Sequence, residues 1–326
     1  MIYLPRKQRG VALLTVLMIL SIMIAIAVNM TGRLTKSIRL TEGLVFSQSA
    51  YWYGQAAAEQ AVIVLNNDFK DKNVVSLNQT WATPNLAFPL QNGGISGNFK
   101  DMRSCFNVNA LRQSAPSNKP SIVGLQFQLL LKEIGITGDN AKIIADSTRD
   151  WVNKNNITSG SQGAEDSYYQ SLGVPYLTAN KLMVDISELR AVRGVGQKTY
   201  DAIVPFLCAI PVADQKINVN TVSAKQPEIL YALFGQNSQL SIEDFKRLLA
   251  DRPASGWSSV DNFLSNPLLR EFQASDSLKK QLSVSSDFFQ LNGLVKFEQR
   301  LLAINLLFKI NNKKAKIIRY QSGGFK

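Results

Sequence analysis

The sequence predicts an α+β protein with a long N-terminal transmembrane helix, a small antiparallel sheet and a large inserted all-α domain. Three observations carry this prediction. An uncharged apolar run occupies residues 11–28, strand-like alternation occurs at 98–110 and at 288–320, and helical periodicity fills most of the chain between them. Since strands flank the helical block on both sides, we expect the block to be an insertion into the sheet-bearing scaffold.

The apolar run is long enough to cross a bilayer. From Val11 to Val28 it holds no charge, and Thr15 and Ser21 are its polar residues. At a 1.5 Å rise per residue it makes a helix of roughly 27 Å, close to the thickness of a bilayer core. A basic leader precedes it and no small-x-small cleavage site follows it. We therefore expect a membrane anchor, and an uncut signal anchor is one form it could take.

The positive charge is concentrated at the two ends. Residues 1–40 carry six Lys/Arg and no acid, and residues 291–326 carry eight Lys/Arg against Glu298. These ends contribute +6 and +7 of the total of +12, which leaves about −1 for the middle. The basic balance is therefore not a property of the globular body, and it does not favour nucleic acid as a partner.

The residue inventory excludes several kinds of chemistry. The chain has no histidine, so His-based triads, zinc sites and acid–base catalysis are absent. No carboxylate pair sits with a nucleophile, a base and an orienting group, and we expect no enzyme. A bridge between Cys105 and Cys208 would contribute roughly 4–5 kcal/mol by chain entropy in an oxidising compartment. Two separate buried thiols remain the alternative.

The elements follow in order along the chain. The first helix continues from the membrane until Asn66, Asn67 and Asp68 give a stop signal. Residues 70–97 are turn-rich, and Asn311-Asn312 is expected to form a hairpin turn between the last two strands. The expected organisation is a leader at 1–10, an N-terminal helix at 11–66 with its membrane part at about 11–30, a scaffold at 67–112 and 285–326, and an inserted α-helical domain at 113–284.

The leader resembles that of a known family. Gly10 followed by an uncharged helix is similar to the class III leader of type IV pilins and type II secretion pseudopilins. The resemblance implies a pilin-like fold, a cut after Gly10 by prepilin peptidase and methylation of the new N-terminus, Val11. It also implies an inner-membrane protein with a periplasmic body.

Several separated motifs narrow the resemblance to the minor pseudopilin K family of type II secretion. They occur in the family's order and are CFNVNAL (105–111), DSTRDWV (146–152), GAEDSYY (163–169), ISELRAVRG (186–194), INVNT (217–221) and SDFFQL (286–291). The resemblance implies a subunit that caps the pseudopilus tip and helps to initiate its assembly for protein export. Its expected partners are minor pseudopilins I and J and the major pseudopilin fibre.

One residue departs from the ordinary pilin pattern. The fifth residue after the cut is usually Glu, whose carboxylate meets the N-terminal ammonium of a neighbouring subunit in the apolar core. Thr15 occupies this position here. A neutral residue suits a subunit at the end of the fibre, whereas drift at a tolerant position would be the plainer explanation.

The loop at 150–169 has the composition of a calcium site. It concentrates carboxylates, amides and turn-forming glycines, and such oxygen ligands suit Ca²⁺. Asp150, Asn153 and Asn155 supply such oxygens, and the family resemblance implies a calcium site in this loop that is closed by Gly163, Glu165 and Asp166. Asn stands where the family is richer in Asp, so we expect weakened affinity. A polar surface turn is the alternative.

A helix-hairpin-helix-like unit at 184–207 suggests a rival function. Gly194, Gly196 and Lys198 could hold a backbone phosphate, as in a type IV pilus or competence-related minor pilin that binds DNA. Residues 217–264 resemble a second copy without the G-x-G hairpin. Such paired helices also serve as packing units, and the near-neutral body does not favour DNA. A secreted enzyme held by an uncut anchor is a further alternative, which no active-site motif supports.

Overall fold

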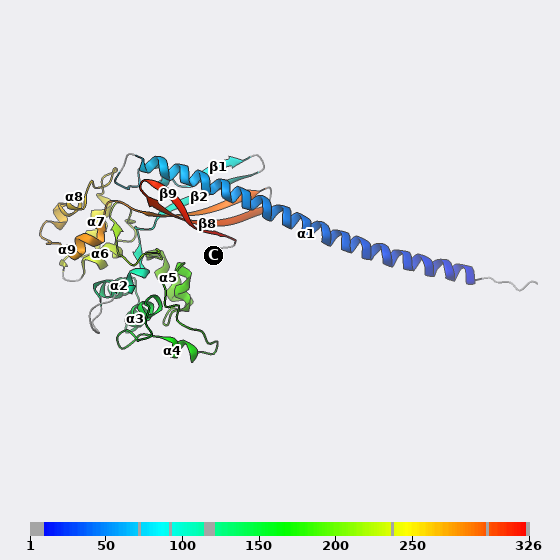
Figure 1. The fold of residues 1–326 in the computed structure, drawn as a ribbon, viewed down its shortest axis with the longest axis horizontal. Helices are drawn as coiled ribbons and strands as arrows, with labels where there is room; N and C mark the ends of the chain where they lie inside the picture. Colours follow the sequence, from blue (N-terminus) through cyan, green and yellow to red (C-terminus); the bar gives the residue numbers. More distant parts are fainter. Residues whose placement is uncertain are drawn as a thin grey trace, which may run out of the picture.

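The computed structural model describes residues 10–70, 73–90, 93–113, 121–235, 238–297 and 300–323. Helix α1 (Val11–Phe69) projects far beyond the rest of the molecule (Figure 1). Its most apolar window has a mean hydropathy of 3.0 and is not buried at all by the protein itself. By length and composition this helix can cross a membrane, as the sequence predicts. The leader residues 1–9 lie outside the described residues.

The C-terminal part of α1 packs on the body, and it ends later than predicted. Ala57, Ala61 and Leu65 recur at a spacing of four residues and are buried against the sheet. The helix passes the predicted stop and continues to Phe69. The polar stop residues have tertiary partners instead: Asn66 Oδ1 accepts from the Ala315 N–H at 2.7 Å. Asp68 similarly accepts from the Trp81 N–H at 2.7 Å, so neither side chain competes for the helix backbone.

A five-stranded antiparallel sheet lies against α1 (Figure 1). Its order is β1-β2-β7-β8-β9. The strands are β1 (Leu86–Leu90), β2 (Gly93–Asp101), β7 (Phe288–Phe297), β8 (Arg300–Asn311) and β9 (Lys314–Ser322). Phe289, Leu306 and Phe308 face α1 and form one core with Leu65. The α+β prediction is confirmed.

The structure corrects three details of the predicted strands. β1 falls in the segment expected to be turns, because it is held by pairing with β2 and not by an alternating pattern of its own. The segment predicted as one strand at 98–110 contains the end of β2, which runs from Gly93 to Asp101, and a separate two-residue strand, Phe106–Asn107. The last hairpin turn is Asn312-Lys313, one residue later than expected, because Asn311 pairs with Lys314. Both turn residues have positive φ, as a two-residue turn of this kind requires.

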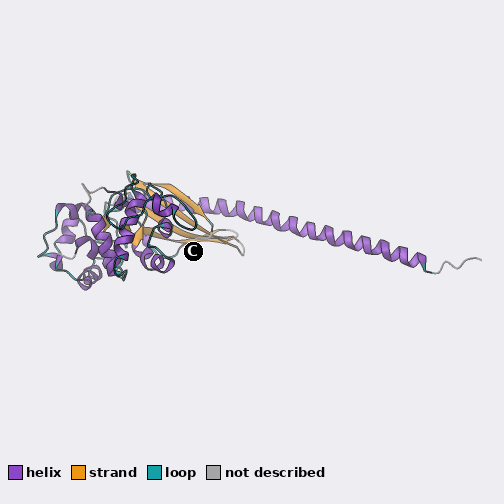
Figure 2. Ribbon diagram, turned by 90° about the horizontal axis from the view of Figure 1, so that it is seen from below, coloured by secondary structure: helices purple, strands orange, loops and turns teal. Residues whose placement is uncertain are grey.

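A block of short helices lies at the end of the sheet away from the free part of α1 (Figures 1 and 2). Its core is continuous from Phe106 to Leu282. The helices are α2 (Ile122–Glu133), α3 (Asn140–Val152), α4 (Asp166–Gln170), η3 (Ile186–Ala191), α5 (Gln197–Ile203), η4 (Val204–Phe206), α6 (Glu228–Phe234), α7 (Ile242–Ala250), α8 (Val260–Leu264), η6 (Pro267–Leu269) and α9 (Asp276–Gln281). The 113–284 boundaries themselves stay a prediction.

Two Asn-x-Asn motifs, Asn107-Val108-Asn109 and Asn218-Val219-Asn220, hold distant segments of the block together in the same way. In the first, the buried Asn109 carboxamide donates to the Met183 carbonyl at 2.9 Å and accepts from the Met183 N–H at 2.8 Å. In the second, the Asn220 carboxamide makes the same pair of bonds with Trp257, at 3.0 and 2.7 Å. Each partner stands two residues before a helix N-cap, Asp185 and Ser259.

The repetition extends to short parallel strands. β3 (Phe106–Asn107) pairs with β4 (Leu207–Cys208), and β5 (Ile217–Asn218) pairs with β6 (Leu282–Ser283). The helical block therefore consists of two units built on one plan. The first unit spans 74 residues between its Asn and its partner, against 37 in the second, and the extra length contains the 150–169 loop.

Candidate functional site

The 150–169 loop joins α3 to α4 and brings two carboxylates together. Asp150 is fully buried on the last turn of α3, and Glu165, which is 3% exposed, occupies the N-cap position of α4. The Ser159 N–H donates to both oxygens of Asp150, at 2.9 and 3.1 Å. The Thr178 hydroxyl donates to Glu165 Oε2 at 3.2 Å, whereas Glu165 Oε1 is buried without a hydrogen-bond partner.

The surroundings of these carboxylates disfavour their ionised form. Burial, and to a smaller extent the charge of Asp146, raise the pKa of Asp150 to about 6. Burial and the charge of Asp150 raise the pKa of Glu165 to about 7. Two adjacent carboxyl groups that resist ionisation are a place where a cation would be stabilised.

Two glycines make room for carboxylates of α3: Gly163 lies beside Asp150, and Gly160 lies beside Asp146. A Cβ on Gly163 would come within 2.6 Å of the Ser159 carbonyl oxygen and closer still to Asp150 Oδ2. A Cβ on Gly160 would lie 2.7 Å from Asp146 Oδ2, and Gly160 has a φ of +59°. Any side chain at either position would occupy the space beside a carboxylate oxygen, so the loop requires glycine at both.

The structure separates the six predicted site residues into two groups. Asp150, Asn153 and Glu165 come together with Gly163, and the Asn153 carboxamide lies 3.5 Å from Asp150 Oδ1. Asn155 is exposed and its side chain accepts from the Ile157 N–H at 2.9 Å. Asp166 is bound by the Thr178 N–H at 2.9 Å and by the Thr178 hydroxyl. Asn155 therefore shapes the loop, whereas Asp166 lies close enough to Glu165 for its charge to raise the pKa of that carboxyl, and the Thr178 hydroxyl contacts both.

Asp146 is a neighbour of the carboxylate pair that the sequence reasoning missed, and its charge acts on Asp150. Its Oδ2 is buried without a hydrogen-bond partner in the described part of the chain. Asp146 precedes Asp150 by four residues, so the two share one face of α3. The four-residue spacing in the sequence could have placed Asp146 beside Asp150. Asp146 precedes the loop, so a count of acidic residues within the loop alone leaves it out.

These residues fit a calcium ion better than a transition metal. The donors are oxygens from carboxylates and amides, with two buried carboxylate oxygens unpartnered. Among the described residues, no three His, Cys, Asp or Glu side chains converge as a metal cluster. Two carboxylates, Asp150 and Glu165, would thus supply the charge, and amide, backbone and water oxygens would complete the coordination.

The predicted hairpin at 194–196 packs against α3 next to this loop. It connects η3, a 3-10 helix where an α-helix was expected, to α5. Gly194 has a φ of +84°, and a Cβ there would press on Ile143 and Ile144 of α3. Arg193 donates to the Gly163 carbonyl at 3.2 Å and lies over the Tyr168 ring. Lys198 is exposed and Gly196 has open space around it.

The remaining predicted residues lie outside the loop. The structure joins Cys105 and Cys208 in a disulfide with their Cα atoms 5.7 Å apart. Gly10 immediately precedes α1 and has a φ of +132°, and Val11 is exposed. The Thr15 hydroxyl donates to the Ala12 carbonyl at 2.9 Å within its own helix.

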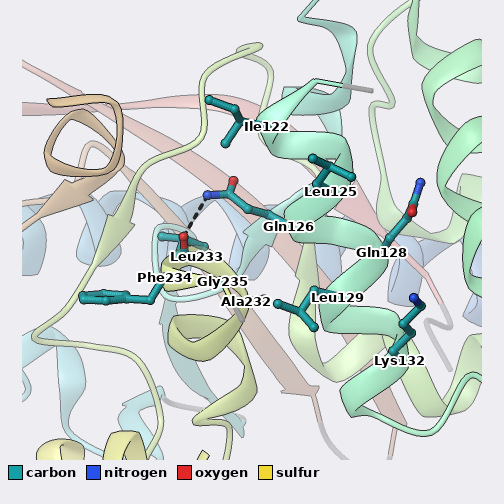
Figure 3. Close-up of a pocket in the computed structure, with 10 residues that line it drawn as sticks. All are labelled: Ile122, Leu125, Gln126, Gln128, Leu129, Lys132, Ala232, Leu233, Phe234 and Gly235. Atoms are coloured by element: carbon teal, nitrogen blue, oxygen red, sulfur yellow. Dashed lines mark hydrogen bonds between the residues drawn. The ribbon is translucent and has the colours of Figure 1, made fainter. Parts of the chain in front are cut away.

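A surface groove lies between α2 and α6 (Figure 3). It has a volume of about 400 Å³, and Ile122 and Leu125 are among its exposed apolar residues. Gln126 closes one side by donating to the Leu233 carbonyl at 3.0 Å. Among the described residues that line it, Lys132 is charged and none is acidic.

Comparisons with known proteins agree with this architecture. Two family models, both described as type II secretion system protein K, match residues 104–212 and 217–285, and each match contains one Asn-x-Asn motif. The chain is 36% identical over 331 residues to the type II secretion system protein K of Aeromonas hydrophila, with 98% of each chain covered. It is 34% identical over 326 residues to that of Pectobacterium carotovorum subsp. carotovorum, again with 98% of each covered.

A solved structure has the same fold. It is a chain of the GspK-GspI-GspJ complex from the type 2 secretion system of enterotoxigenic Escherichia coli. The TM-score is 0.80 at 33% sequence identity, over 87% of this chain and 99% of that one.

Proposed function

Because the chain belongs to the type II secretion system protein K family and is a minor pseudopilin, we propose that it caps the tip of the periplasmic pseudopilus and helps to start its assembly. Its partners in this role are minor pseudopilins I and J, the relatives with which the similar solved chain forms a complex. The role is structural and involves no catalytic step. The inner membrane holds the precursor, and the body lies in the periplasm.

One observation carries the proposal: the two halves of α1 are covered differently. Residues from Ala50 to Phe69 bury an apolar stripe against the sheet, whereas residues 11–40 are exposed along their whole length. Such an exposed apolar helix must be covered by lipid before assembly and by neighbouring helices after it. The α1 helix is thus the assembly element, and prepilin peptidase would free Val11 by cutting after Gly10.

The helical block supports a position at the end of the fibre. It projects from the end of the sheet away from the membrane part of α1, where a subunit above would have to pack (Figure 2). Thr15 adds to this, because its hydroxyl is bound within its own helix and carries no charge for a neighbour's ammonium.

Replacing Thr15 tests the tip position. Thr15→Glu should leave assembly neutral or mildly reduced, because no subunit above would offer an ammonium to the new carboxylate. Pseudopilus assembly and protein export would be compared between the variant and the wild type, and Ser21→Glu serves as a control for a charge in the apolar run. A marked gain of assembly in Thr15→Glu would place this subunit inside the shaft.

Replacing Gly10 independently tests processing. In Gly10→Val the cut after residue 10 should be lost.

We further propose that the 150–169 loop binds Ca²⁺ through Asp150 and Glu165, with Asn153 as a weaker ligand. The bound ion would neutralise the two buried carboxylates and hold the loop that connects α3 to α4. The support is the unpartnered buried oxygen of Glu165 and the space kept beside Asp150 by Gly163. With few charged ligands the affinity should be weak, closer to extracellular modules than to cytosolic sensors.

Chelation of calcium tests this site. Binding to the native state alone would stabilise it by about 2.7 kcal/mol at a hundredfold excess over Kd. A chelator should therefore lower the melting temperature, and Asp150→Asn with Glu165→Gln should abolish the response. The raised pKa of Glu165 implies that protons compete with the ion, so protection should be weaker at pH 6 than at pH 8. Asp251→Asn with Glu271→Gln, both exposed, is the matched control. Melting unchanged by millimolar Ca²⁺ and by chelator would leave a polar surface turn.

A further inference from the structure

The basic C-terminal hairpin has no role in the assembly described above. Residues 301–326 contain no Asp or Glu. Their cations are Lys309, Lys313, Lys314, Lys316, Arg319 and Lys326, and all but the last lie on the hairpin formed by β8 and β9. Arg319 is paired with Asp185 at 3.3 Å. Lys313 donates to the Lys70 carbonyl at 3.2 Å at the end of α1.

The three other lysines share one face of the hairpin. Lys309 stands directly opposite Lys316, and Asn311 stands opposite Lys314. Because side chains alternate along a strand, Ile310 and Ala315 point the other way, toward α1. All three lysines are exposed. We refer to Lys309, Lys314 and Lys316 as the lysine face.

This arrangement is unfavourable in the isolated subunit. Like charges directly opposite one another on neighbouring strands are destabilising. In the part of the chain that the structure describes, no carboxylate lies within 4 Å of a lysine of this face. Lys309 Nζ lies 5.8 Å from the centroid of the Phe288 ring, which attracts the ammonium but supplies no full negative charge. Asp287, whose carbonyl accepts from the Ile310 N–H beside this face, forms an ion pair with Arg103 at 2.8 Å.

Protection of the sheet edge does not account for the pair. β9 is an edge strand, and lysines on an edge prevent other strands from adding to it. Lys309, however, lies on the inner strand β8, where it protects no edge. The register shift at Leu307/Phe308 already distorts the edge. An anion outside the subunit would therefore offset the repulsion between Lys309 and Lys316.

The position of the lysine face excludes the lipid headgroups of the anchoring membrane as the source of that anion. The hairpin turn contacts Lys70, about 40 residues beyond the membrane part of α1, which corresponds to roughly 60 Å along the helix. Charges interact in physiological salt over about 8 Å. Headgroups of the anchoring membrane are therefore too distant to interact with it.

We propose that the lysine face binds an acidic protein surface presented to the membrane-distal end of this subunit. Three ammonium groups on two neighbouring strands match a compact cluster of carboxylates. Duplex DNA presents one charge per about 1.7 Å, so its affinity for a protein increases with the number of phosphates that Lys and Arg neutralise. The near-neutral body does not extend the three lysines into a longer basic surface. This contact goes beyond capping and assembly and does not depend on them.

The test uses the full chain in a neutral detergent, with a fluorescent oligoglutamate peptide as the probe and anisotropy as the readout. Lys309→Gln, Lys314→Gln and Lys316→Gln together should weaken binding about tenfold at low salt, an effect that salt should remove. Lys216→Gln, Lys279→Gln and Lys280→Gln remove the same charge from exposed positions on the helical block and should have little effect.

Three outcomes would overturn the proposal. Equal losses in both triple variants would mean that net charge alone attracts the peptide. Duplex DNA that binds more tightly than the peptide, and loses binding only in the hairpin variant, would make nucleic acid the ligand. A lower melting temperature or aggregation of the hairpin variant would mean that the lysines serve the fold. The proposal instead predicts an unchanged or higher melting temperature, because the substitutions remove the repulsion between Lys309 and Lys316.

Discussion

At the scale of single residues, space beside a charge matters as much as the charge itself. Gly163 and Gly160 each leave room next to a carboxylate, and a methyl group at either position would fill it. The sequence could assign these glycines to turns, since Gly recurs in a polar loop. It could not show that their missing side chains face Asp150 and Asp146, because that follows from how the loop folds back on α3.

Gly163→Ala should destabilise the native state by about 1–3 kcal/mol, the usual cost of forcing extra volume into a packed site. The new Cβ would collide with Asp150 and with the Ser159 carbonyl. Urea denaturation of the full chain in neutral detergent measures the difference. Gly173→Ala is the matched control, because no atom lies within 4 Å of its Cβ position. Equal stability of the two variants would contradict the crowding seen at Gly163.

At the scale of elements, the Asn-x-Asn motifs connect distant segments through side-chain hydrogen bonds to the backbone, a task that strand pairing performs in a regular sheet. Each buried carboxamide pairs with the N–H and carbonyl of one distant residue, as a neighbouring strand would. The helices around them are short, and several are one or two turns long. Tertiary contacts must therefore stabilise them, since isolated helices of this length are marginal in water.

Asn109→Ala and Asn220→Ala should each destabilise the protein by about 2–4 kcal/mol. Asn220→Ala removes two hydrogen bonds, whereas Asn109→Ala removes three, because the Asn109 carboxamide also donates to the Ile210 carbonyl at 2.7 Å. Each variant leaves a buried N–H and carbonyl unsatisfied, at Met183 or at Trp257. If the two units follow one plan, both losses should fall in this range, with the larger loss at Asn109. Thermal melting provides the comparison, and Asn67→Ala on the exposed side of α1 is the control. A small loss at either site would mean that water or a shifted backbone replaces the carboxamide.

At the scale of the whole molecule, the junction between sheet and helical block rests on few residues. The disulfide between Cys105 and Cys208 packs with Met102 and with Phe288 and Leu307 of the sheet. The fully buried Asp101 at the end of β2 accepts from the Thr221 hydroxyl and from Asn218, both of the second unit. Burial raises the pKa of Asp101 and these hydrogen bonds oppose the rise.

Reduction of the disulfide should lower the stability by about 4–5 kcal/mol, the chain-entropy value for a loop of this length, which here separates the cysteines by 103 residues. Calorimetry with and without reductant measures the loss. A variant with Cys105→Ala and Cys208→Ala should melt near the reduced protein and should not respond to reductant. A wild-type protein that melts alike in both conditions would show that packing alone holds the junction.

The amino-acid order by itself determined the elements whose cause is local. The apolar run after Gly10, the order of helical and strand-like segments and the family motifs all depend on neighbours in the chain, so the membrane helix, the α+β class and the family were predictable. Contacts between distant segments decided the rest. Only the folded chain pairs Cys105 with Cys208, brings Glu165 beside Asp150, and extends α1 to Phe69. These outcomes depend on partners more than ten residues away, and periodicity and composition carry no information about such partners.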